Sequence, residues 1–279
     1  MSFVNEIKQE IIEYWQKKSC CRQSEAYGMV LFSVKDDEIS LKTRNPLVSH
    51  HFKRLIKKCF NYDCNTDSLY VNLSKASLPL SYDYRNYNFE CDNCLKAFIR
   101  GAFLVCGQCS DPMKDYMLEF IVYNEDLSLF LQNILSDFGI EVKRCQKTVR
   151  SVKRYSVYLK NSASIEDLLT LMGAQNNSLK LMECKIMKDV RNDINRKTNF
   201  ETANIRKSSE SCAKQLEAIN KLEKSDRLIT LPEDLYELAL FRRDNIDISL
   251  SEVGKKFGLS KAGVHHRLKK IIEKADSLE

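Results

Sequence analysis

The chain has 279 residues and a formal net charge of +6, and 43% of its residues are apolar and 29% charged. This composition is typical of folded globular proteins, so it excludes a chain that is disordered throughout. The sequence contains no apolar run near the ~20 residues that a membrane-spanning helix needs, and acidic residues interrupt the apolar ones at the N-terminus. We therefore expect about two domains, a cytoplasmic protein and no membrane partner.

Helices and strands alternate through the first part of the chain. Apolar spacing predicts, in chain order, a helix over 3–17, a helix over 23–33, a hairpin over 29–43 with Asp36 and Asp37 at its turn, a helix over 47–60, a strand over 68–74 and a loop over 79–90. A similar order then returns as a helix over 94–109, a strand over 116–123, a helix over 127–139, strands over 140–147 and 152–159, and a helix over 164–173. Ser164 fits the cap of this last helix, and Gly139 and Gly173 fit helix ends.

The order helix, two strands, helix thus occurs twice, and Gly28 and Gly101 mark equivalent points about 73 residues apart. The fold class expected for residues 1–175 is α+β, built from diverged repeats over about 20–90 and 91–175. Residues 176–225 are polar and contain neither Pro nor Gly, which predicts a helical linker. Residues 226–279 have their own helical pattern, which predicts a separate all-α domain.

A helix-turn-helix pattern lies within this last segment. Ser249 and Glu252 have the spacing of a capping box, which begins a short helix. Gly258 suits the left-handed turn that ends this helix, and Ser260 then caps a second, basic helix. A preceding helix over 232–245 is expected to pack against these two as the third helix of the domain. Two helices joined by a glycine-containing turn are typical of DNA-binding domains.

The second helix of this motif is expected to enter the major groove of DNA. Its outward face lies opposite the apolar stripe that begins with Val264, and basic residues outnumber acids around it. Such charge displaces counterions from DNA phosphates. The alternative is a helical interaction domain with a solvated basic face. The candidate DNA-binding residues are Ser249, Lys255, Lys256, Ser260, Lys261, Ala262, Gly263, His265, His266, Arg267, Lys269 and Lys270.

A second basic region lies on the two strands predicted between 140 and 159. Basic side chains there alternate with Tyr155 and Tyr158, as on a sheet that faces DNA. A charged outer sheet face without any ligand is about as good an interpretation. The residues of this candidate second DNA face are Lys143, Arg144, Lys147, Arg150, Lys153 and Arg154.

Eleven cysteines occur, including an adjacent pair at 20–21. Their odd number argues against a disulfide framework, so we expect reduced thiols in apolar positions. Cys91-x-x-Cys94 and Cys106-x-x-Cys109 have zinc-ribbon spacing. However, a helix over 94–106 would separate the two pairs by roughly 18 Å at 1.5 Å per residue. We therefore expect no metal, and the lack of glycine-rich phosphate loops predicts no cofactor.

Several stretches resemble known protein families. FIRGAFLVCGQCSDP and SEAYGMVLFS resemble the two signature helices of LAGLIDADG homing endonucleases. The segment around Asn195-Arg196 and ETAN (201–204), together with LSKAGVHHRLKKI, resembles the WhiA family of bacterial regulators. The resemblance covers nearly the whole chain. It implies a catalytically inactive endonuclease-like domain, a helical linker and a DNA-binding helix-turn-helix, with roles in sporulation, cell division and chromosome segregation.

The residues also predict that nuclease activity is lost. The endonuclease signature ends in a metal-binding acid five residues after its glycine. Those positions hold Ser33 and Cys106, and neither offers the anionic oxygen that Mg²⁺ requires. Asp36, Asp37 and Asp111 fall past the helix ends. An active endonuclease with an accessory helix-turn-helix, and a protein scaffold with basic faces, are the alternatives to a sequence-specific, nucleoid-associated transcription regulator.

The polar linker carries further candidate residues that are too hydrophilic for a core. We expect them to orient the two domains, or to contact DNA or a partner. They are Arg191, Asn195, Arg196, Asn199, Glu201 and Asn204. Double-stranded DNA is the expected partner, with other transcription or cell-division proteins as further partners. The sequence leaves the operator, the sign of regulation and the oligomeric state open.

Overall fold

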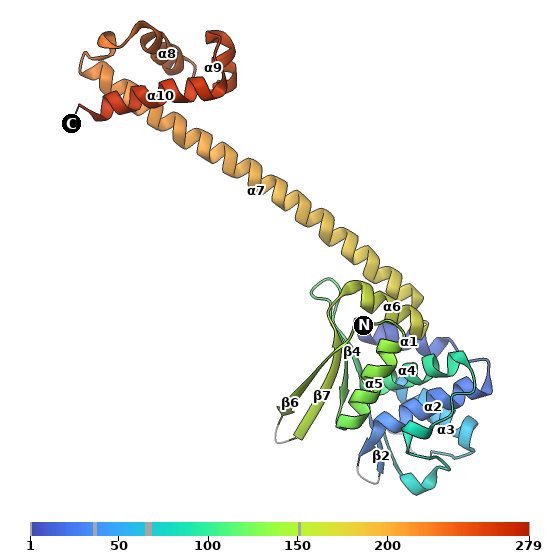
Figure 1. Cartoon of the computed structure of the whole chain (residues 1–279). Coiled ribbons are helices and arrows are strands. Elements are labelled where there is room, and N and C mark those ends of the chain that lie inside the picture. Colours follow the sequence, from blue (N-terminus) through green and yellow to red (C-terminus); the bar gives the residue numbers. More distant parts are fainter. Residues whose placement is uncertain (1, 36–37, 65–68, 150–151, 279) are drawn as a thin grey trace. The chain divides into compact units, whose positions relative to one another are not determined.

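The computed structural model describes residues 2–35, 38–64, 69–149 and 152–278. Contacts divide the chain into two compact units, residues 1–190 and 191–279, so the boundary falls inside the predicted linker. The first unit mixes helices with sheets and the second contains helices only, which confirms the predicted fold class (Figure 1). Within the described residues, every helix is too short or too polar to cross a membrane.

The first unit contains the two predicted repeats, preceded by α1 (Phe3–Glu13). The first repeat comprises α2 (Ser19–Ser33), β1 (Val34–Lys35), β2 (Glu38–Lys42), α3 (Pro46–Phe60) and β3 (Tyr70–Ser74). Two short 3-10 turns, Lys75–Ser77 and Tyr84–Asn86, lead to the second repeat. It comprises α4 (Asp92–Cys106), β4 (Gly107–Cys109), β5 (Leu118–Val122), α5 (Glu125–Asp137), β6 (Lys143–Val149), β7 (Val152–Leu159) and α6 (Ser162–Met172).

Each repeat has its own antiparallel sheet. The strand orders are β1-β2-β3 and β4-β5-β7-β6. Buried residues alternate along the strands, as Ile39 and Leu41 do on β2, so one face of each sheet joins the core. The signature helices α2 and α4 cross between the repeats and are buried on almost all sides. Gly28 and Gly101 lie at this crossing and allow backbone-to-backbone contact.

Some predicted boundaries are wrong. The helix predicted over 94–109 ends at Cys106, because the chain then extends into β4. Asn161, not Ser164, caps α6 by accepting from the backbone N–H of Ala163 at 3.0 Å. The predicted helix over 3–17 ends at Glu13. Residues 29–33 of the predicted hairpin belong to α2, and its turn residues Asp36 and Asp37 lie outside the described residues.

The predicted helical linker is one continuous helix, α7 (Gln175–Lys224). Glu10 of α1 caps its beginning, accepting from the backbone N–H groups of Asn176 and Asn177 at 2.7 and 3.0 Å. Near this end, Leu181 is buried in the core of the first unit. Near the other end, residues such as Ile219 are buried in the core of the second unit. The middle of the helix, 189–210, is exposed throughout.

The second unit packs the end of α7 with a short 3-10 turn, Leu228–Thr230, and three helices: α8 (Glu233–Asp244), α9 (Leu250–Phe257) and α10 (Lys261–Asp276). Its core joins side chains from all of these elements. The buried Arg242 of α8 donates to Gln215 Oε1 of α7 at 3.0 Å and to the Ile248 carbonyl at 2.7 Å. This arginine therefore fixes the segment that leads into α9.

Candidate nucleic-acid interface

Helices α9 and α10 form the helix-turn-helix that the sequence predicts. Both halves of the capping box are present: the Ser249 hydroxyl accepts from the Glu252 N–H, and the Glu252 carboxylate accepts from the Ser249 N–H. Gly258 ends α9 with φ of +63°, a left-handed conformation that glycine adopts without strain. Ser260 then caps α10 by accepting from the Gly263 N–H at 3.1 Å. Local sequence therefore sets where α9 begins and ends and where α10 begins.

The outward face of α10 is free of contacts with the core. Val264, Leu268, Ile271 and Ala275 are buried, whereas Ala262, His265, His266 and Lys269 on the opposite side are exposed. The first half of this face and the beginning of α9 line a shallow hollow. A second hollow between α8 and α10 also includes His266. A convex helix with an exposed polar face suits insertion into a major groove.

The remaining candidates of the second unit differ in how freely they can move. Lys255, Lys261 and Lys270 are exposed, as a phosphate contact requires. Lys256 of α9 lies over the Phe241 ring of α8 at 4.4 Å, which holds its ammonium against α8. Arg267 is half-buried, and its Nε lies 3.1 Å from Asp234 of α8.

Through this ion pair the Arg267 guanidinium joins α10 to α8, and Arg267 also lines the hollow that includes His266. Lys269 is also near an acid, Glu273, one turn away at 3.6 Å, but both side chains are largely exposed. Such an exposed pair is weak and leaves Lys269 available to DNA.

The candidate second DNA face divides between the two faces of the β6–β7 ribbon. Lys147 stands directly opposite Arg154 in the register, and Lys143 stands opposite Tyr158. These residues share the outer face, because the intervening Val157 points into the core. Lys143 and Lys147 are exposed. This face can present three cations to a phosphate backbone.

Arg144 and Lys153 do not share this outer face. Arg144 points to the α5 side, where its NH1 lies 3.4 Å from Glu125. Lys153 is exposed but alternates with Arg154, so it projects from the opposite face. Arg150 lies outside the described residues. The sequence therefore identified the strands but not the side on which each cation stands.

The degenerate signature positions both lie at helix ends, and their side chains bond back into their own helices. The Ser33 hydroxyl donates to the Met29 carbonyl at 2.7 Å, and the Cys106 thiol donates to the Ala102 carbonyl at 3.2 Å. Burial raises the pKa of the Cys106 thiol to about 12. Burial also lowers the pKa of Lys8 to about 8, and Cys106 opposes this shift electrostatically. A lysine ammonium beside this position disfavours a divalent cation.

The cysteines are not grouped as the zinc-ribbon spacing of the sequence would suggest. Helix α4 does separate Cys106 from Cys91 and Cys94. However, Cys20 and Cys21 of the first repeat join Cys91 and Cys94, and all four sulfur atoms lie within 4.8 Å of one another. The expectation of no metal did not consider this grouping, whose members are about 70 residues apart in the chain.

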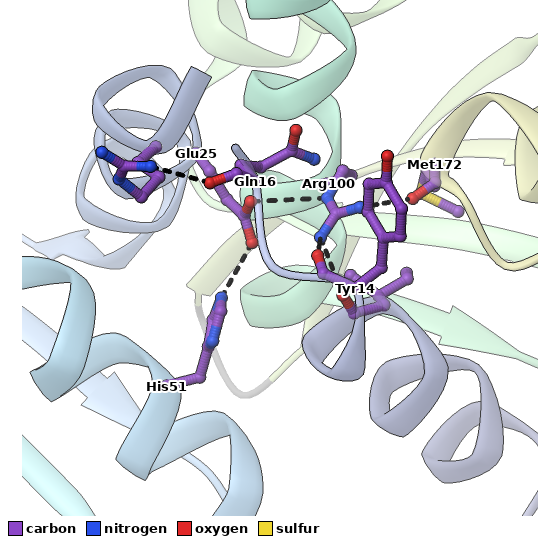
Figure 2. A network of polar contacts seen from close by, with 8 residues as sticks. Tyr14, Gln16, Glu25, His51, Arg100 and Met172 are labelled. Atoms are coloured by element: carbon purple, nitrogen blue, oxygen red, sulfur yellow. Dashed lines mark hydrogen bonds and ion pairs between the residues drawn. The ribbon is translucent and has the colours of Figure 1, made fainter. Parts of the chain in front are cut away.

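A buried charged network is the other feature that sequence patterns missed (Figure 2). Glu25 of α2 lies between His51 and Arg100: its Oε1 is 2.8 Å from His51 Nε2, and its Oε2 is 3.4 Å from Arg100 Nε. All three side chains are at most 3% exposed. The pair Glu25 and Arg100 joins α2 to α4, and His51 adds α3. The network therefore connects the two repeats.

Arg100 also fixes the loop after α1 and the end of α6. Its guanidinium donates to the carbonyl oxygens of Tyr14 at 2.9 Å and Met172 at 3.1 Å, as Figure 2 shows. With Nε2–H donating to Glu25, His51 keeps Nδ1 as an acceptor, and this buried atom has no hydrogen-bond partner. The network thus joins α2, α3 and α4 with the loop after α1 and the end of α6.

The candidate linker residues are all exposed on α7. On a helical wheel Arg191, Asn195 and Asn199 share one side, whereas Glu201 and Asn204 lie on the other. Arg196 lies 3.8 Å from Asp193, with both side chains more than three-quarters exposed. These residues contribute nothing to either core.

Comparisons with known proteins match both parts of the chain. The WhiA LAGLIDADG-like domain matches residues 95–191, and the WhiA C-terminal HTH domain matches residues 194–275. A protein of Clostridium botulinum named "Probable cell division protein WhiA" is 30% identical, over 100% of this chain and 99% of the relative. A protein of Caldicellulosiruptor bescii with the same name is 31% identical, over 100% and 96% of the two chains.

The fold agrees with a solved structure of the same family. Full-length DUF199/WhiA from Thermotoga maritima covers 99% of both chains with a TM-score of 0.59 and 26% sequence identity. The similarity therefore extends over both repeats, the long helix α7 and the helix-turn-helix. This chain belongs to the WhiA family.

Proposed function

We propose that this chain is a sequence-specific DNA-binding protein that regulates transcription and lacks nuclease activity. The observation that carries the proposal is the exposed outward face of α10, with His265, His266 and Lys269, next to a turn fixed by Gly258 and Ser260. The N-terminal part of such a helix reads base edges in helix-turn-helix domains.

The residues divide into reading and anchoring roles. His266 and Lys269 can reach base edges, where a hydrogen-bonding pair discriminates by roughly 1–3 kcal/mol. Lys255, Lys256, Lys261 and Lys270 supply charge to phosphates without sequence preference, and Ser249 and Ser260 can add hydrogen bonds while capping their helices. Ala262 and Gly263 allow close approach to the groove. Arg267 supports this surface through Asp234.

The outer face of the β6–β7 ribbon is the proposed second contact. Lys143, Lys147 and Arg154 would each neutralise phosphate charge without reading sequence. Lys147→Ala should therefore weaken binding to all duplexes alike. Arg144→Ala is the matched control, because Arg144 lies on the α5 side and pairs with Glu125.

The names of the relatives support a role in cell division. We extend the proposal to regulation linked to cell division and chromosome segregation, in the cytoplasm and associated with the nucleoid. Other transcription or cell-division proteins are further proposed partners, and the exposed linker residues on α7 offer a surface for them.

The proposal is tested by binding measurements on selected duplexes. Duplexes enriched from a random library by the full-length protein are compared with scrambled ones over a range of salt concentrations. His266→Ala should lose the preference for the selected sequence. Lys270→Ala should weaken both duplexes equally and lower the slope of log K against log salt by about one. Lys58→Ala, an exposed charge on α3, is the control.

Two results would contradict the proposal. Binding that ignores both sequence and salt would favour a protein scaffold with basic faces. If His266→Ala and Lys270→Ala reduced affinity for both duplexes by one common factor, the division between reading and anchoring residues would be wrong.

A further inference from the structure

We infer that Cys20, Cys21, Cys91 and Cys94 form a binding site for one structural zinc ion. The four thiols lie at the beginnings of two different helices, and their sulfur atoms lie within 4.8 Å of one another. Cys91 Sγ is 3.8 Å from that of Cys20, 3.6 Å from that of Cys21 and 3.5 Å from that of Cys94.

These separations fit a tetrahedral zinc site. A zinc–sulfur bond of about 2.3 Å places the sulfur atoms of a tetrahedron about 3.8 Å apart. The three sulfur–sulfur distances from Cys91 differ from this value by a few tenths of an ångström at most. An iron–sulfur cluster holds its own iron and sulfide atoms between the cysteines, and four sulfurs this close leave no room for them. Soft thiolates in tetrahedral geometry favour zinc, which binds such a site more tightly than Fe²⁺ does.

Burial and coordination number also match a structural site. Cys94 is fully buried and Cys21 is 2% exposed, whereas Cys20 and Cys91 are half-buried. The two half-buried thiols give the ion a path from solvent. Four cysteines complete the tetrahedron without water, which is typical of structural rather than catalytic zinc.

The surrounding backbone offsets the charge of the bound state. Four thiolates and one Zn²⁺ carry a net charge of about −2, which is costly to bury. Cys20 and Cys21 lie in the first turn of α2, and Cys91 and Cys94 lie at the cap and first turn of α4. Both helices direct the positive ends of their dipoles to the site. The backbone N–H of Asn93 bonds to the Cys91 sulfur.

A bound ion would act as a clamp between the two repeats. The signature helices already touch at their glycine crossing, and the zinc would fix their N-terminal ends as well. Because the ligands come in pairs from distant parts of the chain, metal binding would stabilise the folded first unit over the unfolded chain.

Metal content of the full-length protein tests the inference directly. Protein expressed in zinc-containing medium and purified without chelator should contain about one zinc per chain. Cys91→Ser should reduce this content at least tenfold. Serine is a favoured N-cap, so the substitution should leave the beginning of α4 intact. Cys145→Ser, in β6 and away from the cluster, is the matched control and should keep the metal.

Cobalt supplies a readout that does not depend on metal acquired during expression. Co²⁺ added to the reduced, metal-free wild type should give the intense visible bands of a tetrahedral tetrathiolate, and Cys91→Ser should lose them. A wild type that lacks zinc as purified and gives no tetrahedral cobalt spectrum would overturn the inference. A disulfide within the cluster of freshly purified, metal-free protein would do the same and indicate a redox pair instead.

Discussion

Gly28 and Gly101 occupy reciprocal positions where the two signature helices cross. A Cβ at Gly28 would lie 2.3 Å from the carbonyl oxygen of Phe98, and a Cβ at Gly101 would lie 2.2 Å from the carbonyl oxygen of Glu25. Each repeat thus presents its glycine to the backbone of the other. The retained signature glycines have a packing role that does not require catalysis.

Replacing either glycine should therefore destabilise the first unit. Gly28→Ala forces a methyl group against backbone that cannot move without separating the helices, at a cost of about 3 kcal/mol. Trp15 is the one tryptophan and lies in the first unit, so its fluorescence during urea unfolding measures this loss. Gly263→Ala is the control, because its Cβ would meet nothing closer than 3.4 Å. Equal unfolding midpoints for the two variants would refute the close crossing.

Glu25→Gln tests the buried network. It removes the only carboxylate beside the buried Arg100 guanidinium among the described residues, and an uncompensated buried charge costs about 3–5 kcal/mol. Asp63→Asn is the control, because its pair with Lys57 is more than 60% exposed and worth at most about 1 kcal/mol. Urea unfolding followed by Trp15 fluorescence compares the two. A loss for Glu25→Gln no larger than that of the control would mean that the network is not structurally important.

Lys8 predicts a specific pH dependence of stability. Burial lowers its folded-state pKa from 10.5 to about 8, so below that pH the folded protein holds a charged lysine at a cost. The cost is fully present below pH 8 and disappears as the pH rises toward 10.5, where the unfolded chain also loses the proton. Lys8→Met should then be more stable than wild type at pH 7 by about 2–3 kcal/mol.

The difference between wild type and Lys8→Met should shrink between pH 8 and 10.5. Cys106 is common to both proteins, and burial keeps its folded-state pKa at about 12, above this pH window. Lys8→Arg is the control, since arginine stays charged over this range. A stability difference that did not change with pH would mean that Lys8 has an ordinary pKa.

We predict that the protein does not cleave duplex DNA with Mg²⁺ or Mn²⁺. Ser33 and Cys106 bond to their own helices, and neither provides a carboxylate to hold the metal. A plasmid-nicking assay with purified protein checks this. If nicking occurs, Asp111→Asn and the corresponding variants of Asp36 and Asp37 decide its origin. Loss of nicking in any one of them would establish an active site that the signature positions do not reveal.

Arg196→Ala on α7 should lower binding to DNA or to a partner while leaving the stability of the protein nearly unchanged. The side chain is 81% exposed and alanine favours helix, so the Tm should change by no more than about 1 °C. DNA affinity or partner binding should fall if the exposed linker residues make intermolecular contacts. Lys197→Ala removes a neighbouring charge on the same helix and is the control. A Tm lower by many degrees would place Arg196 in a folded core instead.

Features encoded by short sequence stretches could be predicted. The helix-turn-helix is visible because its signals are local: Ser249 and Glu252 are three residues apart, and Gly258 and Ser260 lie in one turn. The helical character of α4 and of α7 follows from the spacing of apolar residues and from the lack of helix-breaking residues. Boundaries such as the end of α4 were missed where a strand pairing, here β4 with β5, replaces the helix.

The contacts between the repeats were decided by tertiary structure alone. Glu25, His51 and Arg100 are separated by 26 residues or more, and nothing around any one of them identifies its partners. The cysteine cluster shows the same limit: the CxxC pairs within one repeat suggested one grouping, whereas the α2–α4 crossing assembled another. Sequence by itself determined the helices, their caps and the signature glycines, because these depend on neighbouring residues. Which charges and thiols meet depended on packing the repeats, because only the close approach of α2 and α4 brings distant side chains together.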